Sequence, residues 1–431
     1  MATRERDRAR IGAAITACVL LWLLVQQLSV IAAIGNGLSP TADPYDEADA
    51  IRAAQHYVEK GFFVDAGLPH IVYGPRFPSD GWVIDLDQPL ASGVYTRYPP
   101  LPELLCGLYE KVFGFEHLWA WRLVPLLVGL GAILFAFLAL RSVLDPVVAG
   151  AMTLLLSSVP MITSHMHGLS FHGYAQALLL TQLAVLTRLL FSDQPPAAAA
   201  VGGIAGLTFV QGWLSFDHAF VVILAVLPLA LLARDAGHEV KVRSVVLLLG
   251  VSGAGFATAS IMHFAQVAWF YGSPSLALKD FVDRAVYRSL GEQGGSHITN
   301  VVRTSMVYTR LLWFAPNAIN PLLKNTSAFG PLLPLLSLVV LVPRLADGLV
   351  SSKSTPAGGL RSLVKSRGAA VLAMLLSYGI AWLWILVMPQ HAGIHLHFVP
   401  HVFFLSYFIV VLDLMLRAFG RAPIASLVPR T

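Results

Sequence analysis

The stretch Asp43-Pro-Tyr-Asp-Glu-Ala-Asp49 lies near the start of the first long polar segment of the chain, and Tyr95-Thr-Arg-Tyr-Pro-Pro-Leu-Pro-Glu103 lies near its end. This segment, residues 36–116, separates the first two apolar runs and holds 12 of the 24 acidic residues. Most of the remaining chain is apolar, so we expect the chemistry in this acidic loop. The packing of the apolar segments then determines which residues lie opposite this loop.

The composition is that of a polytopic membrane protein. Hydrophobic residues make up 56% of the chain, charged residues only 12%, and the mean hydropathy is +0.69, whereas soluble domains carry about 25% charged residues. Apolar runs of about 20 residues are long enough to cross a bilayer as helices. We predict an all-α protein with about ten transmembrane helices, near residues 11–34, 119–141, 146–163, 172–191, 197–214, 217–234, 244–270, 330–343, 369–389 and 399–417. No soluble domain of independent size remains, so residues 1–431 are expected to form a single membrane domain with a second large loop at residues 271–329.

The distribution of basic residues predicts the orientation. Arg4, Arg6, Arg8 and Arg10 precede a long apolar run with no small-residue cleavage site, which favours a retained anchor over a cleaved signal peptide. The positive-inside bias then places the N-terminus in the cytoplasm and both large loops outside the cell inner membrane. The net charge of +5 suits anionic membrane lipids better than nucleic acid, and two cysteines build no disulfide framework.

The first loop contains two amphipathic patterns. Apolar residues recur at helical spacing over residues 46–62 and again over residues 99–112, where prolines stand at the helix start. Such helices lie in the membrane interface. Residues 67–93 are rich in Gly, Pro and Asp and predict an irregular loop, and a further helix is expected over residues 276–290 in the second loop.

Asp46 and Glu47 are the strongest catalytic candidates. A carboxylate at the water–lipid boundary can act as a general base toward an acceptor hydroxyl. The alternative is structural, because acidic residues in the first turn of a helix complement its dipole and cap free N–H groups. Asp43 and Asp49 share that alternative and have a weaker claim to function.

Several cationic and histidine-containing motifs are candidates for binding phosphate or sugar. Arg97 and Tyr98 stand just before a helix start and are expected to meet an anion such as phosphate at the interface, although Arg97 could equally snorkel to lipid phosphate. His165, His167 and His172 form a cluster that could hold a metal, but with no acidic or cysteine ligand beside it, contacts to substrate or simple interface packing are favoured. The remaining candidates are His395 and His397 for a phosphate leaving group, and Asp217, His218 and Arg284 for substrate, with Arg288 as a further phosphate ligand. No cofactor is expected, and the possibility of a divalent metal stays open.

These motifs resemble the GT-C superfamily of membrane glycosyltransferases, and most closely the branch of the protein O-mannosyltransferases and the lipid A aminoarabinose transferase. A tandem Asp-Glu opening the first outer loop matches Asp46-Glu47, and a Pro-Pro-Leu that begins the second interfacial helix matches Pro99-Pro100-Leu101. A loop motif of the family is similar to the segment from Phe281 to Arg288. The chain departs from the family at three sites. Arg97-Tyr98 stands where relatives usually have His or Lys just before the prolines, His397-Phe398-Val-Pro400 stands where they often read Arg-Tyr-x-x-Pro, and His172 stands where many have an acidic residue.

The resemblance implies transfer of a hexosyl or pentosyl group from a polyprenyl-phosphate donor to a hydroxyl of a lipid, glycan or protein acceptor. The reaction would invert the anomeric carbon, and Asp46 or Glu47 would act as base. The alternative is a transporter or flippase for a lipid-linked or anionic substrate. That class predicts ionisable residues near the membrane midplane and pseudo-repeated halves, neither of which is clear in this sequence. A metal-dependent hydrolase using the histidines, and a non-catalytic subunit, remain further alternatives.

Overall fold

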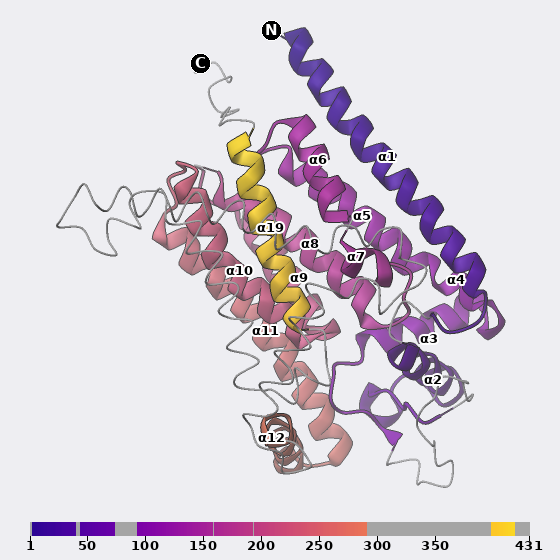
Figure 1. The fold of residues 1–431 in the computed structure, drawn as a ribbon. Helices are drawn as coiled ribbons and strands as arrows, with labels where there is room; N and C mark the ends of the chain where they lie inside the picture. The colour runs from indigo at the N-terminus through magenta and orange to yellow at the C-terminus, as the bar shows by residue number, and fades with distance from the viewer. Residues whose placement is uncertain are drawn as a thin grey trace.

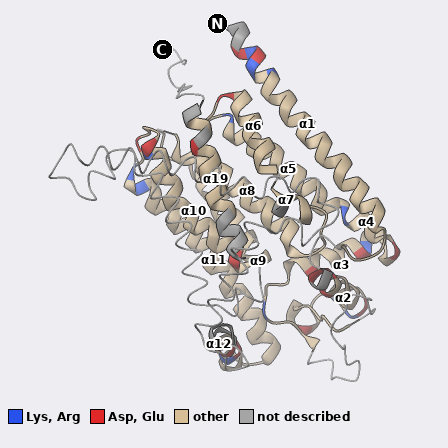
Figure 2. Ribbon diagram, viewed as in Figure 1, with Lys and Arg blue, Asp and Glu red and all other residues tan. Residues whose placement is uncertain are grey.

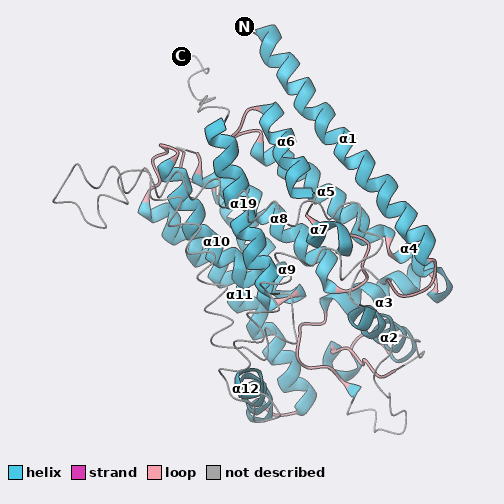
Figure 3. Cartoon of the chain, viewed as in Figure 1, coloured by secondary structure: helices cyan, strands magenta, loops and turns pink. Residues whose placement is uncertain are grey.

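The computed structural model describes residues 2–39, 44–73, 93–157, 159–192, 194–290 and 398–418. In these ranges the chain is helical apart from connecting turns and one isolated antiparallel bridge between His70 and Val94 (Figures 1 and 3). The long helices are α1 (Ala2–Ile34), α5 (Leu123–Leu140), α8 (Phe171–Leu190), α9 (Ala198–Leu214), α10 (Phe216–Asp235), α11 (Val242–Tyr271) and α19 (Phe398–Ala418). The shorter elements are α2 (Pro44–Lys60), η1 (Val64–Gly67), α3 (Leu101–Phe113), η3 (Phe115–His117), α4 (Leu118–Trp121), α6 (Pro146–Ser157), α7 (Pro160–His165) and α12 (Pro274–Leu290).

The all-α polytopic architecture is confirmed. Within the described residues, five helical segments are long and apolar enough to cross a membrane: Glu5–Ile34, Phe115–Leu140, Phe171–Leu190, Phe216–Asp235 and Val242–Tyr271. The runs predicted at residues 197–214 and 399–417 correspond to α9 and α19, and those at residues 330–343 and 369–389 lie outside the described residues. The run at residues 146–163 is divided between α6 and α7, because Pro160 at the start of α7 cannot continue a preceding helix.

Small residues allow close helix contacts. α1 packs against α6, and a Cβ added at Gly12 would lie only 2.1 Å from the backbone oxygen of Pro146. A Cβ at Gly150 would lie 2.9 Å from the backbone oxygen of Gly12. Backbones that approach this closely are typical of helix pairs in membranes, where packing rather than the hydrophobic effect holds helices together.

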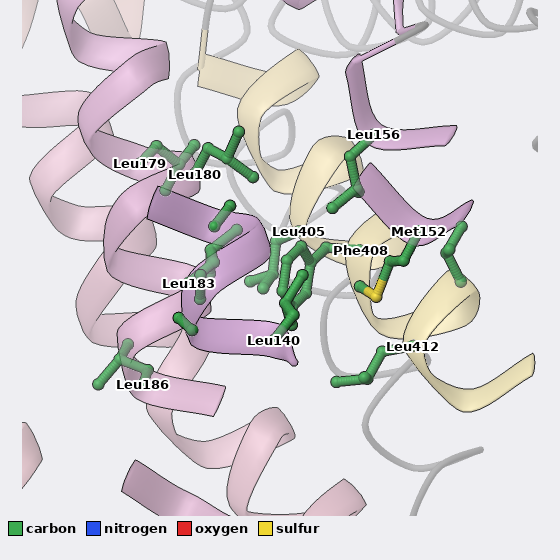
Figure 4. Close-up of a cluster of buried hydrophobic side chains, with 14 of the residues drawn as sticks. Leu140, Met152, Leu156, Leu179, Leu180, Leu183, Leu186, Leu405, Phe408 and Leu412 are labelled. Carbon is green, nitrogen blue, oxygen red and sulfur yellow. The ribbon is translucent and has the colours of Figure 1, made fainter. Parts of the chain in front are cut away.

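An apolar core fills the half of the bundle nearer the N-terminus. Leucine, methionine and phenylalanine side chains from α5, α6, α8 and α19 meet there (Figure 4). The labelled members are Leu140, Met152, Leu156, Leu179, Leu180, Leu183, Leu186, Leu405, Phe408 and Leu412, and each is at most 2% exposed. α8 is central, with 72% of its apolar window buried, whereas α1 and α11 bury only 22% and present apolar surface suited to lipid.

The predicted surface helices lie across the opposite end of the bundle. α2, α3 and α12 are found far from the N-terminus, and α2 and α12 run across the long helices (Figure 1). Charged residues of the described helices gather toward the two ends of the bundle (Figure 2). Both amphipathic patterns of the first loop and the helix expected near residues 276–290 are therefore confirmed as helices. Of the irregular loop expected at residues 67–93, residues 74–92 lie outside the described residues.

Candidate functional site

Arg122 and Glu47 form a buried ion pair behind the first turn of α2. Nη1 of Arg122 donates to Oε1 of Glu47 at 2.6 Å and Nη2 donates to Oε2 at 3.0 Å, and both side chains are fully buried. The same carboxylate accepts the backbone N–H groups of Ser39 at 2.8 Å and Leu169 at 3.0 Å. Four donors occupy the acceptor positions of one carboxylate. Glu47 therefore ties α2 to the segment before it, to the start of α5 and to the turn before α8.

The hydrogen-bond network continues from Ser39 to α1 through His167. Oγ of Ser39 lies 2.8 Å from Nε2 of His167, and Nδ1 of His167 lies 2.7 Å from Oε1 of Gln27. Nε2 of Gln27 donates in turn to the backbone oxygen of Thr163 at 2.9 Å. Because the amide oxygen of Gln27 only accepts, Nδ1 of His167 carries the proton in this arrangement. Burial lowers the pKa of His167 to about 3, with the charge of Arg122 as a second cause, so the ring stays neutral.

Asp46 lies on the side of the first turn of α2 opposite to Glu47. Its Oδ2 lies 3.1 Å from Nε2 of His172, which is fully buried at the start of α8, while the Asp46 side chain keeps 34% of its surface exposed. Asp46 also lines a cavity beside α2. Two neighbours in sequence thus have opposite environments, and of the two carboxylates only Asp46 is within reach of a substrate.

The cavity has an aromatic wall and carboxyl groups. The space within it and the open solvent at its mouth together amount to about 540 Å³. Tyr98 stacks on Phe171 with ring centroids 5.9 Å apart and on Tyr95 at 6.2 Å. The lining residues are Asp46, Asp49, Ile71, Tyr95, Tyr98, Pro99, Pro102, Glu103, Ser170, Phe171 and Leu214. Carboxyl groups hydrogen-bond hydroxyls, and flat aromatic faces offer apolar contact area, so this wall suits a small polyhydroxylated ring.

The histidines expected to bind substrate lie around Asp46, although they are not among the residues that line the cavity. The ring of His165 lies 4.9 Å from that of His172, and burial lowers the pKa of His165 to about 4. Nδ1 of His218 lies 2.9 Å from Oγ of Ser215, and its ring lies 6.1 Å from that of Phe171. His172 contacts Asp46 directly, His165 lies against His172, and His218 lies near Phe171 of the aromatic wall. His167 belongs to the buried network with Ser39 and Gln27.

The residues predicted to bind phosphate are placed differently from one another. Tyr98 lines the cavity, whereas Arg97 is exposed with its guanidinium 6.0 Å from the ring of Tyr95. Arg284 and Arg288 lie on α12, but their side chains are outside the description, and His395 and His397 lie outside the described residues altogether. Asp217 is half-buried in the first turn of α10.

Metal ligands are not grouped in the part of the chain that the structure describes. No set of three or more His, Cys, Asp or Glu side chains in those ranges is arranged to hold a metal ion.

The sequence interpretation missed Arg122 and Glu103. Arg122 could have been found, because an arginine inside a predicted span is a functional or structural signal by default. Glu103 gave a weaker signal, since an acidic residue in the first turn of a helix is common for capping reasons alone.

Comparisons with known proteins give two matches of low identity. No known protein family matches the sequence, and no curated protein matches it. The chain is similar in structure to the archaeal oligosaccharyltransferase AglB from Archaeoglobus fulgidus in complex with an inhibitory peptide and a dolichol-phosphate, with a TM-score of 0.44 and 14% identity over 97% of this chain. It is also similar to the Archaeoglobus fulgidus oligosaccharyltransferase in the apo form, with a TM-score of 0.41 and 13% identity over 96% of this chain. The chain spans about half the length of these structures, since the matches cover 52% of each.

Proposed function

We propose that this chain is a membrane glycosyltransferase of the GT-C type that moves a hexosyl or pentosyl group from a polyprenyl-phosphate donor to an acceptor hydroxyl. The acceptor would be a lipid, a glycan or a protein. The observation that carries the proposal is the position of Asp46, an accessible carboxylate at the edge of a cavity, held by His172 and backed by a buried ion pair. The Asp-Glu and Pro-Pro-Leu motifs that suggest the family both lie at this cavity.

In the proposed reaction Asp46 accepts the proton of the acceptor hydroxyl as its oxygen attacks the anomeric carbon. The carbon–oxygen bond to the lipid phosphate breaks, and the configuration inverts. The N–H of His172 would orient the Asp46 carboxylate and stabilise its charge before the attack. Glu47 would not exchange protons, because its oxygens are already bound by Arg122 and two backbone N–H groups.

The departing lipid phosphate needs cations rather than an acid, because a phosphate is already a stable leaving group. Preorganised donors at such a position contribute about 10²–10³-fold each to the rate. Arg97 and Tyr98 are the proposed donors beside the cavity, with Arg288, His395 and His397 as proposed contributors from later segments. The proposed location is the cell inner membrane, with the N-terminus in the cytoplasm and the active site on the extracytoplasmic face.

The test is release of free polyprenyl phosphate by the purified protein in lipid nanodiscs. The assay offers a panel of polyprenyl-phosphate sugars with a native membrane extract as the source of acceptor, and it compares wild type with Asp46→Asn. Release by wild type alone supports both the reaction and the base. If wild type releases nothing from any donor, the proposal is wrong, and transport of the same lipids becomes the function to measure.

A further inference from the structure

α3 carries two glutamates whose carboxyl pKa values are raised by burial, and one of the two lines the cavity. Burial raises the pKa of Glu103 to about 8, with the charge of Asp49 as a smaller cause, and raises the pKa of Glu110 to about 7. Glu103 lines the cavity beside Asp46 and Asp49, whereas Glu110 is absent from its lining. The two glutamates lie seven residues apart, about two turns of one helix, so each is a natural control for the other.

The environment of Glu103 balances a negative charge only in part, because its own backbone N–H favours the charged form while burial opposes it more strongly. Its Oε2 is shielded from solvent and has no hydrogen-bond partner among the described residues. An ionised carboxylate left in that state is costly, and a buried carboxyl group commonly keeps its proton instead. A neutral carboxyl group has one O–H donor and retains acceptor capacity.

The rest of the cavity determines which ligand such a group would meet. The stacked rings of Tyr98 and Phe171 provide a flat apolar surface, while Asp46 and Asp49 supply acceptors. A ring with a C–H face and hydroxyl groups at its edge fits this combination, because each hydroxyl both donates and accepts a hydrogen bond.

We propose that Glu103 is a specificity-determining residue of the cavity, a neutral carboxyl group that exchanges hydrogen bonds with one hydroxyl of a sugar ring. This proposal rests on the function proposed above and adds a residue that recognises the substrate without taking part in the chemistry. The hydroxyl belongs either to the transferred sugar or to a carbohydrate acceptor, and the arms of the test distinguish them.

The experiment measures KM and kcat for Glu103→Ala, Glu103→Gln and the control Glu110→Gln. The substrates are a polyprenyl-phosphate sugar that wild type uses, its single-deoxy analogues and the corresponding acceptor series. One lost neutral hydrogen bond costs roughly 3–10-fold, so Glu103→Ala should raise one KM by that factor with little change in kcat. The Glu103→Ala enzyme should also use one deoxy analogue as well as it uses the parent substrate. The position of the missing hydroxyl in that analogue identifies the hydroxyl that Glu103 binds and the substrate that carries it. Glu103→Gln, which keeps a neutral donor and acceptor, should recover most of the loss, and Glu110→Gln should behave as wild type.

Two results would overturn the proposal for Glu103 without contradicting the proposed glycosyltransferase function. One is a Glu103→Ala enzyme with unchanged KM values and unchanged selection among deoxy analogues. The other is a Glu103→Gln enzyme as inactive as Asp46→Asn, which would make Glu103 an ionised participant.

Should Glu103→Ala fail to fold, infrared spectra of wild type and Glu103→Gln decide the protonation state of Glu103. The carbonyl band of protonated carboxyl groups at neutral pH should shrink on substitution of Glu103, leaving the smaller contribution of Glu110, and no change in that band would contradict the proposal. These spectra need no substrate, so they remain informative even if wild type transfers no sugar.

Discussion

The two sides of the first turn of α2 differ in burial and in hydrogen-bond partners. On one side Glu47 is fully buried and bound by Arg122 and two backbone N–H groups. On the other side Asp46 is partly exposed, contacts His172 and borders the cavity. A helix turn can therefore hold one carboxylate rigidly as an anchor and present the next one to substrate. The predictions below separate a loss of chemistry from a loss of structure.

Substitution on the cavity side should have the largest effect on the rate. Asp46→Asn removes the base but keeps the size of the side chain, so the transfer rate should fall by about 10²–10⁴-fold while the melting temperature changes little. The measurement is release of polyprenyl phosphate, with thermal unfolding of the same preparation in detergent. Glu59→Gln, near the other end of α2 and exposed, is the control and should match wild type in both. An active Asp46→Asn enzyme would exclude Asp46 as the base.

Substitution on the buried side should have the opposite result, a large loss of stability rather than a direct loss of chemistry. Glu47→Gln leaves the charge of Arg122 buried without its partner, and breaking a buried pair in this way costs about 3–5 kcal/mol of unfolding free energy. Chemical denaturation should show that loss. Replacing both residues, as Glu47→Leu with Arg122→Leu, should recover part of the stability because no unpaired charge remains. If Glu47→Gln proved as stable as wild type yet inactive, Glu47 rather than Asp46 would be the catalytic carboxylate.

The buried network should also weaken in acid. His167 has a pKa of about 3 in the folded chain against an ordinary value of 6.5, so below pH 6.5 the unfolded chain binds a proton that the folded chain does not. Stability then rises with pH between the two values and is lost as pH falls, by about 1.4 kcal/mol per pH unit for one proton. Unfolding free energies of wild type and of His167→Gln at several pH values between 6.5 and 4 isolate this slope, because the shifted pKa values of His165, Glu103 and Glu110 contribute to both chains alike. Substituting the exposed His117 should leave the slope unchanged, and a His167→Gln slope equal to that of wild type would mean that the ring of His167 is not held neutral by burial.

How far the sequence predicts these regions depends on the type of signal. The helices near Asp46 and Pro99 follow from hydrophobic periodicity and are confirmed as α2 and α3. The spans follow from apolar run length, and those that fall in the described residues are found as helices of the bundle, whereas the runs at residues 330–343 and 369–389 lie outside the described residues. Pairing of Glu47 with Arg122 could not be predicted in the same way, because 75 residues separate the two and only the packing of α2 against the start of α5 brings them together. For the same reason the sequence favours Asp46 as the base without excluding Glu47, since periodicity does not show which side of a surface helix will be covered.

The smallest expected effect concerns the contact between the two helices at the cavity, His172 to Asp46. Substituting His172 by Phe keeps an aromatic ring but removes the N–H that lies 3.1 Å from the Asp46 carboxylate. A hydrogen bond to a charged group is worth about 1.5–3 kcal/mol, so the rate should fall by about 10- to 150-fold. The acid limb of the pH–rate profile should also move to higher pH, because the carboxylate loses a donor that favours its charged form. His172→Gln, which retains an N–H, should restore part of both effects. A purely structural role for His172 would lower the melting temperature without moving the profile, so the pH dependence decides whether this histidine serves the chemistry of Asp46 or only the packing of α8.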